Sequence, residues 1–144
     1  GMNSRLDTLQ AAILIEKLKI FPKEIIQRNL IADFYRERFE NLNISCQYIP
    51  KGYKSVYAQF SIILKNESQR NSVQKALNEG GIPSVIYYVI PGHLQKGYKY
   101  LGYKKGDFPV SEDLSRRILS LPMHPYLNLN NIEKITNVIK NNLN

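Results

Sequence analysis

The sequence is poor in the residues that build disulfides and metal sites. Its 144 residues include one cysteine, two histidines and no tryptophan. A single cysteine forms no intrachain disulfide and no thiolate metal site alone, and Cys46 stands in an apolar, strand-like stretch, which predicts a buried thiol. His93 and His124 are far apart in the chain, and neither has a second ligand at metal-binding spacing. We therefore expect no metal site.

The sequence also has no long hydrophobic run and no glycine-rich phosphate loop. No stretch approaches the roughly 18 apolar residues that a membrane span requires, and the first five residues contain no apolar signal core. Together with the single cysteine, this predicts a cytoplasmic protein. Cys46 lacks electropositive neighbours, so nothing in the sequence indicates nucleophilic catalysis.

Positive charge is in excess, with 20 Lys and Arg against 12 Asp and Glu and a net charge of +8. This excess would attract nucleic acid, an anionic membrane or a phosphorylated small molecule, and the sign alone does not choose among them. Residues 96–105 interleave lysines with tyrosines, a pattern that can hold single-stranded nucleic acid. No nucleic-acid-binding module accompanies it, so a solvated loop is the favoured interpretation.

The length fits one domain, and 43% hydrophobic residues supply a core. Apolar periodicity and capping signals predict an α+β fold in which helices cover a small sheet of about three strands. The expected helices are residues 5–19, with Ser4 and Asp7 as a capping box, 23–40 after Phe21-Pro22, 66–79 with Asn66 as cap, 94–101, 111–119, and a last one from near Asn130. The expected strands are residues 44–49, 56–64 and 82–89.

Three places could carry binding chemistry. Asn3 and Arg5 would lie at the first turn of a helix, where backbone N–H groups and a guanidinium favour an anion. On pattern alone, a plain helix cap is the favoured alternative. His93 follows Pro91-Gly92 in an expected surface loop, where solvation is favoured over substrate contact, and Tyr88 could line a pocket or enter the core.

Several blocks in order resemble the pyridoxal-phosphate-dependent nucleotide-sugar aminotransferases of the DegT/DnrJ/StrS type, which are fold-type I enzymes. The first block is GMNSRLDTLQAAIL at residues 1–14, followed by Lys17-Leu18 and Arg28. The later blocks are SVYAQF at 55–60, GIP at 81–83, YVIPGH at 88–93, FP at 108–109 and LSLPMHP at 119–125. The loop departs from the family's usual Tyr-Pro-x-Pro-Leu-His, because Val89 and Gly92 occupy its second and fifth positions.

The resemblance implies that residues 1–144 are the small C-terminal domain of such an enzyme, with a small antiparallel sheet and with residues 1–40 as the helical segment leading into it. The large domain with the Schiff-base lysine would be absent, so the chain would hold no catalytic residue and no covalently bound pyridoxal phosphate. In the family, the residues matching Asn3 and Arg5 reach across a homodimer interface toward the partner's cofactor phosphate or substrate. The loop matching Tyr88 and His93 lies near the sugar-nucleotide site.

The function implied is transfer of an amino group from glutamate to a nucleotide-linked keto-sugar, for surface polysaccharide synthesis. The chain alone would be inactive and would work with pyridoxal phosphate in its parent, as a homodimer or in association with a large aminotransferase domain. Two alternatives remain open: a stand-alone remnant or partner subunit without catalysis, and a basic nucleic-acid-binding module. An unpartnered apolar stripe on the first helix is also expected.

Overall fold

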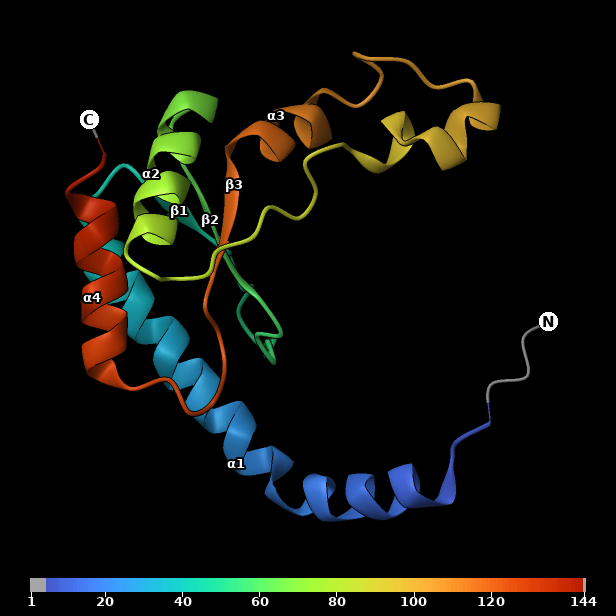
Figure 1. The fold of residues 1–144 in the computed structure, drawn as a ribbon, viewed down its shortest axis with the longest axis vertical. Helices are drawn as coiled ribbons and strands as arrows, with labels where there is room; N and C mark the ends of the chain where they lie inside the picture. The colour runs from blue at the N-terminus through green and yellow to red at the C-terminus, as the bar shows by residue number, and fades with distance from the viewer. Residues whose placement is uncertain (1–4, 144) are drawn as a thin grey trace.

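The fold was analysed in a computed structural model, which describes residues 5–143, so Asn3 and the expected capping role of Ser4 lie outside the described residues. The fold consists of a long helix, a small sheet and three shorter helices, and the strands of the sheet come from both halves of the chain (Figure 1). The elements are α1 (Thr8–Phe39), β1 (Ser45–Cys46), β2 (Phe60–Ile63), α2 (Glu67–Glu79), the 3-10 helices η1 (Gly92–Leu94) and η2 (Lys96–Leu101), α3 (Pro109–Arg117), β3 (Ile118–Leu121) and α4 (Leu129–Lys140).

The sheet has three antiparallel strands in the order β1-β2-β3, which confirms the α+β fold class. The central strand β2 pairs with both neighbours, with Phe60 opposite Leu121 and Ile63 opposite Ser45. Phe60 and Ile62 lie two residues apart on one face of β2, and both are fully buried in the core. On the opposite face the hydroxyls of Ser61 and Ser120 form a hydrogen bond of 2.8 Å, which satisfies two buried polar groups across the strands.

The third strand is not the one that the sequence predicted. Residues 82–89 form no strand, and only Val85 bridges to Ser120, through two backbone hydrogen bonds. Ile118–Leu121, part of which was expected to be helical, is β3 instead. A short apolar run does not distinguish helix from strand, and pairing with β2 decides it here. Pro83 has no N–H to give to a ladder, which disfavours a strand at residues 82–89.

Residues Thr8–Phe39 form one helix of 32 residues, where the sequence predicted two helices. Pro22, expected to end the first helix, lies inside α1, and the ribbon changes direction along this helix (Figure 1). A proline in a helix removes one hydrogen bond and pushes against the preceding turn, so it bends the helix when flanking residues continue it. The helix begins at Thr8, where the Asp7 side chain accepts a hydrogen bond from the Leu9 N–H at 2.9 Å, so Arg5 lies before the first turn.

Other boundaries shift by a few residues. The strand expected at 44–49 is only two residues long, and the one expected at 56–64 begins at Phe60, after Tyr57 in the left-handed region with φ of 41°. In place of the α-helix expected at residues 94–101, the 3-10 helices η1 and η2 follow each other with Gln95 between them. The helix capped by Asn66 is confirmed, and α4 starts just before the expected position, with Asn128 as its cap.

The core lies between the second half of α1, the sheet, α2 and α4. Tyr35 is central to it: its ring stacks on Phe60 with centroids 4.9 Å apart, and its hydroxyl donates to the Pro122 carbonyl at 3.0 Å. From α4, Ile132, Ile135 and Ile139 are buried, in agreement with the expected stripe.

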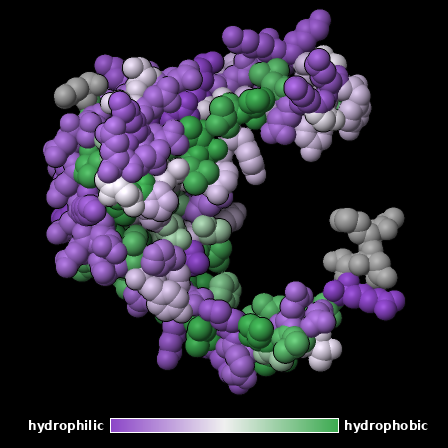
Figure 2. Space-filling view, viewed as in Figure 1, coloured by the Kyte–Doolittle hydropathy of each residue, from purple (hydrophilic) through white to green (hydrophobic). Residues whose placement is uncertain are grey.

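The first half of α1 extends away from this core as an arm (Figure 1). Its large apolar side chains are exposed, as expected, and Figure 2 shows them gathered along the arm. They include Leu9, Ile13 and Leu18, whose exposed fractions are 75%, 61% and 65%. None of the helices in residues 5–143 is long and apolar enough to cross a membrane.

Candidate functional site

A pocket of about 600 Å³ opens between the loop before η1 and the start of α3. Aromatic and aliphatic side chains dominate its wall, which is the usual composition of a small-molecule site. The lining residues are Tyr87, Tyr88, Pro91, Gly92, residues 107–111, Leu114, Ser115 and Ile118. The pocket therefore brings together residues 87–92 and residues 107–118, and each of these segments contains residues of a resemblance block.

Tyr88 lies at this pocket, as the sequence allowed. Its ring meets that of Tyr87 edge to face, with centroids 5.8 Å apart, and it is 67% exposed. An exposed tyrosine at a pocket edge offers an apolar face and a hydroxyl to a ligand. The alternative, that residues 87–88 enter the core, is wrong, because neither side chain is buried.

His93 is not the solvated loop residue that its sequence context favoured. Its side chain is only 7% exposed, and its Nε2 lies 3.0 Å from Oε1 of Glu112 on α3. Its ring packs on Phe108, with centroids 4.8 Å apart, and Phe108 lines the pocket. His93 thus lies directly behind one wall of the pocket rather than among its lining residues.

Glu112 connects His93 to the loop before α3. Its Oε1 also accepts a hydrogen bond from the Gly106 backbone N–H at 2.7 Å. The Gly106 N–H and His93 together lower the pKa of the Glu112 carboxyl, against the opposing effect of its desolvation. A carboxylate at neutral pH is therefore expected here, and it acts only as an acceptor.

Arg5 is not among the residues that line this pocket. The start of the described chain lies beyond the end of the arm, across an open hollow from η1 and η2 (Figures 1 and 2). Arg5 is exposed, and among residues 5–143 it makes no ion pair. The structure therefore does not bring Arg5 together with Tyr88 and His93 within one chain.

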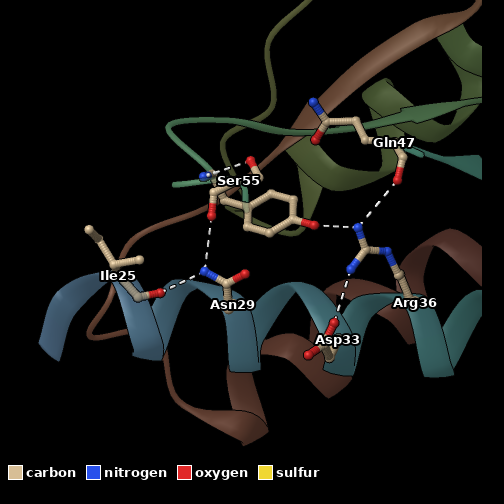
Figure 3. Close-up of polar contacts among 7 residues, drawn as sticks. Ile25, Asn29, Asp33, Arg36, Gln47 and Ser55 are labelled. Atoms are coloured by element: carbon tan, nitrogen blue, oxygen red, sulfur yellow. Dashed lines mark hydrogen bonds and ion pairs between the residues drawn. The ribbon is translucent and has the colours of Figure 1, made fainter. Parts of the chain in front are cut away.

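A group of polar contacts holds the loop before β2 against α1 (Figure 3). Asn29 donates to the backbone carbonyls of Ile25 and Ser55, at 2.8 and 3.0 Å. Arg36 pairs with Asp33 and donates to the Tyr57 hydroxyl. Arg28, part of the first resemblance block, donates to the Tyr57 carbonyl at 3.0 Å. These residues have a structural role: they fix the second half of α1 to the domain.

The remaining candidates offer little chemistry. Cys46 is half-buried rather than fully buried, and burial raises the pKa of its thiol, which disfavours a reactive thiolate. Within residues 5–143, no group of three His, Cys, Asp or Glu side chains could hold a metal ion. In the Tyr/Lys loop, Tyr103 packs edge to face on Phe108 at 5.0 Å, whereas Tyr100 is 80% exposed.

Comparison with known proteins decides the family. The model of the DegT/DnrJ/EryC1/StrS aminotransferase family matches residues 1–140. The chain belongs to this family. It is 39% identical over 141 residues to the UDP-2-acetamido-2-deoxy-3-oxo-D-glucuronate aminotransferase of Pseudomonas aeruginosa. It also resembles the crystal structure of a DegT/DnrJ/EryC1/StrS aminotransferase from Brucella abortus, with 48% identity and a TM-score of 0.87.

The chain corresponds to only part of these aminotransferases. The two alignments cover 98% of this chain but 38% of the Pseudomonas protein and 37% of the Brucella chain. A third relative, the E. coli GDP-4-keto-6-deoxy-D-mannose-3-dehydratase with bound hydrated pyridoxal phosphate, is 26% identical with a TM-score of 0.82, and the chain covers 36% of it. Family members thus use pyridoxal phosphate, and the chain spans less than two-fifths of their length.

The described residues fit this cofactor only in part. A Schiff-base site needs a lysine in a pocket, and no lysine is among the residues that line the 600 Å³ pocket. Arg5 does suit a phosphate group, because its guanidinium is exposed just ahead of a helix start. Among residues 5–143, the lining of this pocket therefore offers no lysine to bind the cofactor covalently, and Arg5 carries a charge of the sign that suits a phosphate group.

Sequence reasoning did not find Glu112 or Phe108 as parts of the site. Glu112 reads as an ordinary acidic residue in the first turn of a helix, and its partner His93 lies 19 residues earlier. Phe108 carried a signal only as part of the Phe108-Pro109 resemblance block. The fold brings both together with the loop at 87–93.

Proposed function

We propose that this chain is the C-terminal domain of a pyridoxal-phosphate-dependent aminotransferase that moves an amino group from glutamate to a nucleotide-linked keto-sugar. In this proposal residues 1–144 are one small domain with residues 1–40 as its leading helical segment, and the large domain with the Schiff-base lysine lies outside it. The enzyme works in the cytoplasm as a homodimer and supplies amino sugars for surface polysaccharides. The chain alone is inactive.

The observation that carries the proposal is the match of the family model to residues 1–140, combined with an aromatic pocket that has no lysine in its wall. The Pseudomonas relative is named as an aminotransferase of a UDP-linked 3-oxo sugar acid, which is the substrate class proposed here. The exposed apolar side chains of the arm also favour the proposal, because an apolar surface of this kind is normally covered by a partner, here the large domain.

Each site residue has a separate task in this proposal. Bound pyridoxal phosphate supplies the electron sink for amino transfer. Arg5, together with Asn3, reaches the partner subunit's cofactor phosphate or substrate with a fixed positive charge. Tyr88 binds the nucleotide sugar at the mouth of the pocket, and His93 supports the same wall from behind. The apolar wall excludes water from the part of the substrate that it covers.

The test uses the full-length protein encoded by the gene that contains this sequence. It is incubated with pyridoxal phosphate, glutamate and a series of UDP- and dTDP-linked keto-sugars, and mass spectrometry detects the aminated product and 2-oxoglutarate. We expect amination of at least one UDP-linked 3-keto sugar. The 144-residue chain, assayed in parallel, should give none.

Absence of an aminated product from every keto-sugar would contradict the proposal. Full activity of the 144-residue chain would also contradict it, because the described residues place no lysine in the pocket. Sedimentation of the full-length protein tests the homodimer. A monomer that retains activity would exclude a site shared between subunits.

A further inference from the structure

We infer that Glu112 is a positioning residue of the nucleotide-sugar site: it fixes the orientation and tautomer of His93 and, through Gly106, the loop that forms the pocket wall. This inference rests on the proposed function for its substrate. Glu112 itself does not line the pocket, and its effect on a ligand would pass through His93 and Phe108.

The geometry joins three segments at one oxygen atom. Oε1 of Glu112 lies 3.0 Å from His93 Nε2 and 2.7 Å from the Gly106 N–H, which donates to it. The side chains of His93 and Glu112 are 7% and 8% exposed. Because both are shielded from water, the hydrogen bonds between them are worth more than at the surface, and losing the acceptor would leave two donors without a partner.

The hydrogen bonds of Glu112 Oε1 with His93 and Gly106, referred to below as the junction, hold the wall of the pocket in place. The residue directly before each partner lines the pocket: Gly92 before His93, and Ser111 before Glu112. Phe108, two residues after Gly106, also lines it and packs on the His93 ring. Gly106 has φ of +100°, which a side chain would strain, so the tight turn that presents its N–H depends on glycine. Moving the carboxylate would therefore release the loop and the ring together.

The junction also determines where the proton of His93 lies. An ionised Glu112 has no proton to give, so the His93 nitrogen that faces it, Nε2, must carry a proton. In the neutral imidazole this leaves Nδ1 as an acceptor. No hydrogen bond from Nδ1 to another group occurs among residues 5–143. Glu112 thereby makes Nδ1 of the neutral His93 ring a hydrogen-bond acceptor for any donor that approaches it.

The experiment separates positioning from general stability by comparing two substrates of one enzyme. In the full-length protein with pyridoxal phosphate, Glu112→Ala is expected to raise KM for the nucleotide sugar by about 10- to 100-fold, the usual cost of losing a residue that orients a binding group. KM for glutamate should change by less than about twofold, because the proposal assigns this wall to the nucleotide sugar. Glu79→Ala, which removes an exposed carboxylate of α2 that faces Lys75 at 3.8 Å, is the control and should change neither value.

Two further variants test the acceptor. Glu112→Gln keeps an oxygen at the same reach, so it should restore KM for the nucleotide sugar to within about threefold of the parent value. Glu112→Asp keeps the charge but is shorter by one methylene, so it should behave like Glu112→Ala. This shorter variant also replaces Glu112→Ala if the latter does not fold. An equal rise of both KM values, or no rescue by glutamine, would overturn the inference.

A second readout does not depend on activity. With 15N-labelled histidine, and with His93→Gln to assign the signal, His93 should show a proton on Nε2 in the parent protein and in Glu112→Gln, and should lose this preference in Glu112→Ala. A neutral His93 protonated on Nδ1 in the parent would overturn the inference. If no nucleotide sugar is aminated but the tautomer follows Glu112 as described, the proposed function fails and the positioning of His93 by Glu112 stands.

Discussion

Replacing Tyr35 tests how α1 is joined to the rest of the domain. Tyr35 has no exposed surface, and its hydroxyl donates to the carbonyl of Pro122, 87 residues later in the chain. Tyr35→Phe removes this donor and leaves the carbonyl without a partner, so the free energy of unfolding should fall by about 1–2 kcal/mol. Tyr35→Ala also removes a ring stacked on Phe60 and should lower it by about 3–5 kcal/mol.

The measurement is equilibrium unfolding of the 144-residue chain in urea, followed by far-ultraviolet circular dichroism. Tyr126→Phe is the matched control, because its hydroxyl also donates a hydrogen bond, to Glu24 at 2.6 Å, but the tyrosine is 68% exposed. An exposed hydrogen bond competes with water, so its loss should lower the free energy of unfolding less than the loss of the buried Tyr35 bond does. Equal effects of Tyr35→Phe and Tyr126→Phe would refute the reasoning that burial makes the Tyr35 hydrogen bond count.

Tyr35 should also make the free energy of unfolding depend on pH. Burial raises the pKa of the Tyr35 hydroxyl above its ordinary value of 10.0. Its neutral form is therefore the one that the folded state favours, so this contribution is complete below about pH 10 and is lost as the pH rises toward the folded-state pKa. The parent chain should lose more stability than Tyr35→Phe between about pH 9 and pH 11. A parallel loss in both proteins would show that Tyr35 is not responsible.

Substitutions at three further residues test the attachment of α1 and the site. Asn29→Ala should lower the free energy of unfolding in urea by about 1–2 kcal/mol, because the Ser55 carbonyl loses its donor, and an unchanged midpoint would contradict this. In the full-length protein, Arg5→Ala should weaken pyridoxal phosphate or nucleotide-sugar binding about tenfold or more in titrations, and Arg5→Lys less so; unchanged affinity for both would exclude the cross-subunit role. Tyr88→Ala should raise KM for the nucleotide sugar by about tenfold while Tyr88→Phe keeps most of the apolar contact, and identical kinetics for all three proteins would remove Tyr88 from the site.

The sequence predicts the elements whose signals are local. The helix capped by Asn66 and the stripe of α4 depend on neighbours within a few residues, and both are confirmed. The strand β3 depends on a distant partner, because it forms by pairing with Phe60–Ile63. The helix α1 continues past Pro22 against the local signal to stop, because the residues on both sides of the proline remain helical. Local propensity is a weak guide where such contacts compete with it.

The site shows the same division. The aromatic loop at Tyr88 could be marked as a candidate from its own residues and from the family resemblance, and it does line the pocket. The environment of His93 could not, because a histidine after Pro-Gly in a loop gives no sign that a carboxylate from α3 will meet it. Burial of both side chains is a property of the assembled fold, and it reverses the expectation of a solvated ring.

The proline inside α1 has a mechanical consequence. At about 1.5 Å per residue, the helix extends about 21 Å from Pro22 back to Thr8, while the second half is fixed to the domain by Asn29, Arg36 and Tyr35. The direction of the first half of α1 therefore depends on the bend at Pro22, so the first half acts as a lever that turns about this residue. A change of about 10° in the bend would carry the start of the helix about 4 Å sideways, more than the length of a hydrogen bond. The angle at one residue thus sets the reach of Arg5, which lies just beyond the lever's tip.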